Sequence, residues 1–167
     1  MAKDLNSELV IAPEAPADGP GVMELVERAF GPGRYAKSAE RLREGNAFDP
    51  GLSFVARRDG RVAGSVRLWP VRIGPRAALL LGPIAVDEAA RSRGLGAALA
   101  ERACDAAAAA GHELVVLVGD LGFFQRIGFE WAPADVQLPG PADPQRILVK
   151  ALKPGAAEGL EGVLALP

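Results

Sequence analysis

Apolar residues recur along this chain with two spacings, at every second position in some stretches and at every third or fourth position in others. The first spacing is typical of strands and the second of helices. Helices are expected at 18–30, 37–44, 94–110 and 122–127. Strands are expected at 9–11, 52–57, 62–73, 77–86, 114–118, 129–131 and 146–152. Loops are expected at 133–144 and 154–162, and we find no internal repeat or linker, so residues 1–167 are expected to form one domain.

The connections between these segments predict how the strands pair. Asp59-Gly60 separates two apolar runs, which strongly favours a tight hairpin and therefore an antiparallel pair. The alanine-rich helix 94–110 lies between strand 77–86 and the fully apolar strand 114–118, as a crossover between parallel strands requires. An α+β fold with a mixed, mostly antiparallel sheet follows, with Asp18 as the expected N-cap of its first helix.

Composition and charge exclude several classes of protein. The 19 basic and 21 acidic residues give a net charge of -2, so no broad positive field would attract nucleic acid or an anionic membrane. No apolar run approaches the roughly 18 residues of a membrane span. The single Cys104 cannot form an internal disulfide, and no signal-like segment opens the chain, so we expect a cytoplasmic protein. We expect this protein to be a monomer or a homodimer.

The turn that enters the crossover helix is the best candidate for ligand binding. Gly94 and Gly96 remove side chains where backbone N–H groups could approach an anion, and a helix dipole follows them. Arg91 and Arg93 add positive charge. The alternative is a tight turn without a ligand.

Two nucleotide-binding motifs can be tested at this turn. A dinucleotide fingerprint would need a third glycine at position 99, which is leucine, and Glu113 precedes the next strand instead of following it. A P-loop would need a Gly-Lys-Ser or Gly-Lys-Thr sequence, which is absent. The spacing therefore favours neither ligand.

Three segments resemble the GNAT acetyltransferase superfamily. Arg91–Gly96 fits its Gln/Arg-x-x-Gly-x-Gly/Ala motif, Leu79–Val86 resembles its fourth strand, and Phe123–Phe129 resembles its closing Gly-Phe motif. The resemblance covers about residues 8–152. It implies that two central parallel strands splay apart in a V and that acetyl-CoA lies between them, with no metal. Gly82-Pro83 offers a local reason for the splay, because proline lacks a ladder donor and marks bulges.

The resemblance also implies which residues hold the cofactor. They are Ile84, Ala85, Val86, Arg91, Ser92, Arg93, Gly94, Leu95, Gly96, Ala97 and Phe124. Among them, the backbone N–H of Ile84 would polarise the thioester carbonyl and stabilise the developing oxyanion. The alternative for Ile84 and Val86 is an ordinary core strand.

The acid and base of the expected aminolysis are less clear. Many family members have a proton-donating tyrosine where this chain has Phe124, which cannot donate a proton. Tyr35, the only tyrosine, is one stand-in for the acid, and Asp120 is a candidate base. Packing explains Tyr35 equally simply, and Asp120 is also suited to capping the next helix.

Four further residues have side chains that could serve a functional role. His112 is expected near the end of the helix far from the turn, and Cys104 is expected to project away from the stripe of Leu95 and Leu99, in no nucleophile or metal constellation. Arg67 and Trp69 share one face of their strand and are candidate acceptor-binding residues, for a carboxylate and for an apolar or cationic group. The alternative is a solvated outer face.

The leading hypothesis is therefore transfer of an acetyl group from acetyl-CoA to a primary amine of a small molecule or peptide. A non-catalytic acyl-CoA-binding sensor or scaffold with the same fold is the alternative, because Phe124 replaces the usual acid. A domain that uses the groove for protein contacts is a third possibility.

Overall fold

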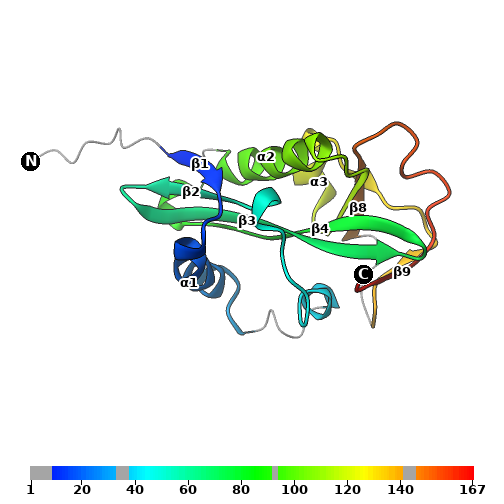
Figure 1. Ribbon diagram of the computed structural model, residues 1–167, viewed down its shortest axis with the longest axis horizontal. Coiled ribbons are helices and arrows are strands. Elements are labelled where there is room, and N and C mark those ends of the chain that lie inside the picture. The colour runs from blue at the N-terminus through cyan, green and yellow to red at the C-terminus, as the bar shows by residue number, and fades with distance from the viewer. Residues whose placement is uncertain (1–8, 33–37, 92–93, 141–145) are drawn as a thin grey trace, which may run out of the picture.

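The computed structural model describes residues 9–32, 38–91, 94–140 and 146–167. Its α-helices are α1 (Gly19–Phe30), α2 (Leu95–Ala109) and α3 (Leu121–Phe124), labelled in Figure 1. The strands are β1 (Val10–Pro13), β2 (Phe54–Arg58), β3 (Arg61–Ile73), β4 (Arg76–Val86), β5 (Leu114–Val118), β6 (Glu130–Trp131), β7 (Val136–Gln137), β8 (Ile147–Ala151) and β9 (Gly162–Ala165). No helix in these ranges is long and apolar enough to cross a membrane.

The strands form a mixed sheet in the order β1-β2-β3-β4-β5-β8-β6. Neighbours in this order pair antiparallel except β4 and β5, which are parallel and joined by the crossover helix α2. β9 pairs antiparallel with the last two residues of β3 and parallel with β7. The predicted α+β class and the predicted parallel pair are both confirmed.

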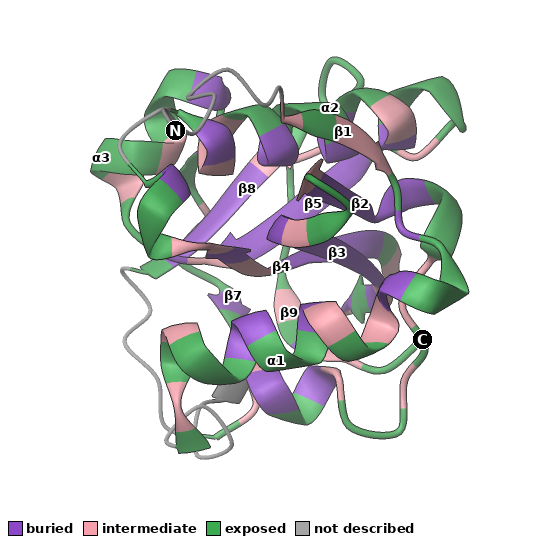
Figure 2. Ribbon diagram, turned by 90° about the vertical axis from the view of Figure 1, so that its left-hand side faces the viewer, coloured by how far each residue is buried: buried purple, intermediate pink, exposed green. Residues whose placement is uncertain are grey.

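Helices cover the sheet on both faces. Figure 1 shows α1 on one side of the long β3–β4 hairpin and α2 with α3 on the other, and Figure 2 shows the buried strands between these layers. On the α2 face the core contains Leu99, Ala103, Val66 and Leu117. On the α1 face, Val22 and Leu25 pack on β2 and β4. A second cluster on that face lies beneath the C-terminal segments.

The parallel pair is short, and this creates an opening in the sheet. β4 pairs with β5 only at Leu79 and Leu80, although β4 continues to Val86 along β3. The register of β3 and β4 shifts between Val66 and Leu68, so Gly82 and Pro83 together face Arg67. This is a β-bulge at the predicted Gly82-Pro83 irregularity. The last residues of β4 are therefore separated from β5, as the splay requires.

Several boundaries differ from the sequence-based expectation. Ser38–Leu42 form a 3-10 helix where an α-helix was expected, so the described residues contain three α-helices and not four. The expected loop 133–144 contains β7, which pairs across the chain with β9. The pairing of β7 with β9 is a long-range contact, which short local patterns do not encode.

The environment of Cys104 on α2 differs from the expectation. Its side chain is 1% exposed and belongs to the same core cluster as Leu95 and Leu99, although it projects from a different side of the helix. The small side chains of the helix let a wide face approach the sheet, so the buried stripe includes this position. Burial raises the pKa of the Cys104 thiol to about 11, which keeps it neutral and unreactive.

Asp18 precedes α1 but makes no side-chain cap. Its carboxylate instead accepts hydrogen bonds from Nε and Nη2 of Arg57 on β2, with the Nε contact at 2.9 Å, and from the backbone N–H of Ala15. The Arg57 hydrogen bond holds the pKa of Asp18 below its usual value, against the opposing effect of burial. The expected N-cap is thus an ion pair that ties the start of α1 to the sheet.

We predict that Asp18→Asn lowers the free energy of unfolding at pH 7 by about 1–2 kcal/mol, because the charge-assisted pair is lost. The folded pKa lies below the unfolded value of about 4, so the carboxylate's contribution is complete above that value and is lost as the pH falls through the folded pKa. Urea unfolding of both proteins at pH 7 and pH 3 measures the difference, which should shrink at pH 3.

Asp105→Asn is the matched control, since Asp105 is exposed on α2. It should change the unfolding free energy little at either pH. An Asp18→Asn effect of equal size at pH 7 and pH 3 would contradict the assignment.

Candidate functional site

A pocket of about 600 Å³ opens where the splayed end of β4 meets the start of α2. Its walls also include α3 and the C-terminal end of α1. Most residues that the sequence assigned to a cofactor line this one space, namely Ile84, Ala85, Val86, Arg91, Gly94, Leu95, Gly96 and Phe124. Residues distant in sequence thus come together as the resemblance implied.

The first turn of α2 provides hydrogen-bond donors to this pocket. Gly94 adopts a left-handed conformation, with φ of 72°, and stands as the N-cap. The N–H of Ala98 donates to the carbonyl of Gly94, so the amides of Leu95, Gly96 and Ala97 precede the first intrahelical bond. Such amides and the helix dipole together favour an anion.

The two glycines of the turn serve different geometric needs. Apart from Gly94 and its chain neighbours, no atom of the described residues lies within 4 Å of the position that a Cβ of Gly94 would occupy, but its positive φ disfavours other residues. A Cβ at Gly96 would lie 3.6–3.8 Å from the side chains of Phe123, Val86 and Ile84. Gly96 therefore keeps the pocket wide where β4, α2 and α3 converge.

The pocket carries positive charge within an acidic chain. Arg91 and Arg126 line it, and the described lining residues include no carboxylate. Arg91 is held at the end of β4, where its Nε donates to the carbonyl of Val86 at 3.3 Å. A local anion site is thus compatible with the overall charge of -2.

Backbone groups at the end of β4 face the splay. The N–H of Asp87 donates to the carbonyl of Ala63 on β3. Backbone polar groups of successive residues alternate between the two sides of a strand, so Ala85 also faces β3 while Ile84 and Val86 face the opposite side. That side has no β5 partner, because the β4–β5 pairing ends at Leu80.

Aromatic rings form the wall contributed by α3. Phe124 packs edge-on against Phe123 and Phe129, with ring centroids 4.8 and 5.7 Å away. It also lies against the backbone of Gly119, where a Cβ would come within 2.8 Å of the ring. Phe124 therefore has a packing role and offers no proton to the pocket.

Sequence reasoning missed several lining residues: Ala29, Phe30, Ala90, Phe123 and Arg126. Phe30 and Phe123 are 40% and 43% exposed, and exposed aromatic rings are a sign of a binding surface. Neither could be placed at the pocket before α1 and α3 were packed beside β4. Arg126 lies two residues before Gly128-Phe129, and this closeness to the family motif is the sequence feature that could have indicated its place at the pocket.

The candidates for proton transfer are not gathered in this pocket. Asp120 is exposed, and its Oδ1 accepts a hydrogen bond from the N–H of Gly122 at 3.2 Å, so it is the N-cap of α3. His112 lies beyond the far end of α2. Tyr35, Ser92 and Arg93 lie outside the described residues.

Arg67 and Trp69 are buried, which contradicts the alternative of a solvated outer face. Arg67 donates from Nε and Nη2 to the carboxylate of Glu14, at 3.0 and 2.7 Å, and its guanidinium stacks on Phe48. Trp69 donates from Nε1 to the carbonyl of Gly82 at 2.6 Å. Both polar groups are thus already bound within the protein, and an acceptor carboxylate at Arg67 would compete with Glu14.

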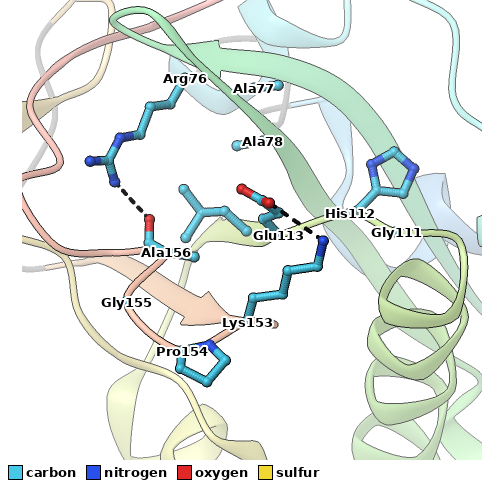
Figure 3. Close-up of a pocket in the computed structure, with 11 residues that line it drawn as sticks. Arg76, Ala77, Ala78, Gly111, His112, Glu113, Lys153, Pro154, Gly155 and Ala156 are labelled. Atoms are coloured by element: carbon cyan, nitrogen blue, oxygen red, sulfur yellow. Dashed lines mark hydrogen bonds and ion pairs between the residues drawn. The ribbon is translucent and has the colours of Figure 1, made fainter.

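A second hollow of about 650 Å³ lies at the opposite end of β4 and α2 (Figure 3). Its charged groups are engaged by the protein: Lys153 pairs with Glu113 at 3.4 Å, and Arg76 donates to the carbonyl of Ala156 at 2.8 Å. Lys153 and Glu113 are more than half exposed. None of the predicted cofactor residues lines it, so the candidate site is the first pocket.

Known proteins share this sequence and architecture. The chain is 33% identical over 160 residues to the uncharacterized N-acetyltransferase YhbS of Escherichia coli K12, covering 93% of this chain and 95% of that one. The crystal structure of Escherichia coli YhbS in complex with CoA superposes with a TM-score of 0.83 at 31% identity, covering all of this chain and 94% of that chain.

A GNAT family acetyltransferase from Brucella melitensis, solved with acetyl-CoA, gives a TM-score of 0.71 at 27% identity over 97% of both chains. The sequence pattern of the acetyltransferase (GNAT) family matches residues 20–129, from α1 to the Gly-Phe motif. Family pattern, sequence identity and fold agree: this chain belongs to the GNAT family of acetyltransferases.

Proposed function

We propose that this chain transfers an acetyl group from acetyl-CoA to a primary amine of a small molecule or peptide. One observation carries the proposal: a single pocket joins the N-terminal turn of α2 to the backbone edge of β4 in the splay. A pocket with an anion-binding site at one end and a strand edge not paired with β5 at the other suits a long cofactor that has phosphates at one end and a thioester at the other. The CoA and acetyl-CoA complexes of the two relatives support this.

In the proposed complex, the pyrophosphate binds the first-turn amides of α2 and the guanidinium of Arg91. The pantetheine arm runs along the Val86 end of β4 and pairs with its backbone. The thioester carbonyl then lies at the N–H of Ile84. From the family resemblance we also propose that Ser92, Arg93 and Ala97 contribute to phosphate binding, and that Phe124 contacts the thiol end.

The reaction would proceed by direct transfer. The amine nitrogen attacks the thioester carbonyl carbon, and the N–H of Ile84 stabilises the oxyanion of the tetrahedral intermediate. The C–S bond then breaks, CoA leaves as a thiolate, and the amine proton passes to a base, for which Asp120 is the candidate, while Tyr35 is the candidate acid for the thiolate. A thiol pKa of about 8.5 allows the thiolate to leave without a protein acid.

A non-catalytic acyl-CoA sensor or scaffold is the second candidate. The specific observation in its favour is Phe124, whose ring replaces a proton donor and packs between Phe123 and Phe129. Such a domain would bind acetyl-CoA in the same pocket but would lack turnover.

One pair of measurements separates these functions. Calorimetry with acetyl-CoA should show saturable binding, after which thiol release is followed across a panel of amines, amino acids and peptides. We expect amine-dependent release and an acetylated product by mass spectrometry. Binding without release for any amine would favour the sensor, and absence of binding would refute both functions.

We predict that Gly94→Trp abolishes acetyl-CoA binding, because Gly94 lines the pocket and its side-chain direction is open space that an indole would fill. Calorimetry should show an affinity loss of at least about a hundredfold, consistent with loss of several charge-assisted hydrogen bonds.

Gly111→Trp is the matched control. Gly111 also has a positive φ, of 90°, and outside its chain neighbours no atom in the described part of the chain lies within 4 Å of its Cβ position, but it lies at the other end of α2. Backbone strain should affect both variants similarly, whereas only Gly94→Trp should lose the cofactor. Unchanged affinity in a folded Gly94→Trp protein would refute this placement of the pyrophosphate.

We predict that Phe124→Tyr leaves kcat unchanged or raises it, because the added hydroxyl supplies a proton donor to a leaving thiolate that otherwise departs without one. Steady-state kinetics with the best amine from the panel, across the pH range 6–9, tests this. Phe123→Tyr, on the exposed neighbouring ring of the same wall, is the control and should change little. A steep fall in kcat at normal acetyl-CoA affinity would instead assign Phe124 an essential packing role.

A further inference from the structure

A buried tryptophan side chain donates a hydrogen bond to the β-bulge in β4. Gly82 and Pro83 occupy the place of one residue opposite Arg67, which interrupts the regular ladder between β3 and β4. At this point the indole Nε1 of Trp69 donates a hydrogen bond of 2.6 Å to the carbonyl of Gly82. Trp69 is only 8% exposed, so this hydrogen bond is shielded from water.

A chain of contacts fixes the orientation of that indole. Trp69 meets the ring of Phe48 edge-on, with centroids 5.6 Å apart. The guanidinium of Arg67 lies 4.0 Å from the Phe48 centroid, and both oxygens of the Glu14 carboxylate hold this guanidinium. Glu14 is itself 6% exposed. Trp69 is therefore a constrained donor and has little freedom to turn toward a ligand.

The bulge decides which amides of β4 face the splay. Side chains and backbone groups alternate along a strand, so one extra residue reverses the side to which every later amide points. Beyond the bulge, Ala85 and Asp87 face β3, and Ile84 and Val86 face the opening. Without the extra residue, the amide of Ile84 would point toward β3 and away from the proposed thioester.

We propose that Trp69 is a positioning residue that holds the Gly82 carbonyl and thereby aims the Ile84 amide at the acetyl carbonyl of the cofactor. The inference rests on the proposed acetyl-CoA site but assigns a role to a residue that does not line it. It also replaces the expectation that Trp69 contacts the acceptor. The effect on catalysis passes through the backbone between Gly82 and Ile84.

Trp69→Phe removes the N–H and retains a ring beside Phe48, and Trp131→Phe is the matched control, since Trp131 is 54% exposed on β6. The main readout is the carbonyl ¹³C resonance of [1-¹³C]acetyl-CoA bound to each protein, which moves downfield when the oxygen accepts a hydrogen bond. We expect this shift in the wild type and in Trp131→Phe, and a much smaller shift in Trp69→Phe. The affinity for CoA, which has no acetyl carbonyl, should be unchanged in all three proteins.

With an amine acceptor, kcat of Trp69→Phe should fall roughly ten- to a hundredfold, because an oxyanion donor is misdirected but not removed. Phe48→Leu keeps the Trp69 indole but removes the ring that packs against it, so the fall in kcat and the loss of the ¹³C shift should both be smaller than in Trp69→Phe. It also tests the inference if Trp69→Phe does not fold.

The outcomes distinguish this inference from the function on which it rests. A wild-type protein that binds neither CoA nor acetyl-CoA refutes the proposed function. A full ¹³C shift in folded Trp69→Phe overturns the positioning role while leaving the proposed function intact. Equal losses of CoA and acetyl-CoA affinity would also overturn the positioning role, because they indicate general disruption of the pocket.

Discussion

The parallel pairing between β4 and β5 ends after Leu80, and the candidate site depends on this interruption. A backbone amide inside a protein must find a partner, and in most sheets the neighbouring strand supplies it. Here β4 continues for six residues along β3 alone, so one edge of its backbone is available beside a pocket. Proline at position 83 lacks an N–H and the bulge displaces the strand, which makes the separation a property of the chain itself.

The second requirement is an anion site in a protein of net charge -2. The fold meets it locally, because the crossover from β4 to β5 brings the N-terminus of α2 to the open end of the sheet. First-turn amides, Arg91 and Arg126 converge there without a described acidic side chain in the lining. The same crossover places the other end of α2, followed by His112, beside the start of β4, away from this pocket.

Ion pairs of two buried carboxylates fix the elements around this opening. Asp18 and Arg57 join the start of α1 to β2, and Glu14 and Arg67 join the residue after β1 to β3. The partners of these pairs are 39 and 53 positions apart in the chain, respectively. Removal of one partner would leave a charge in a poorly solvated place, so the first pair holds the start of α1 against the sheet and the second holds the end of β1 beside β3.

The sequence by itself determined the fold class, the Asp59-Gly60 hairpin, the crossover helix and the turn Arg91–Gly96, because each depends on local periodicity, turn chemistry or motif spacing. It also indicated the bulge, since proline at position 83 has the same effect in any sheet. Tertiary structure decided the rest. Whether Cys104 faces the core, whether Asp18 caps a helix or binds Arg57, and whether Trp69 meets an acceptor or the Gly82 carbonyl all depend on partners distant in the chain. Local spacing gives the direction of a side chain relative to its own element, whereas its partner is set by how the elements pack.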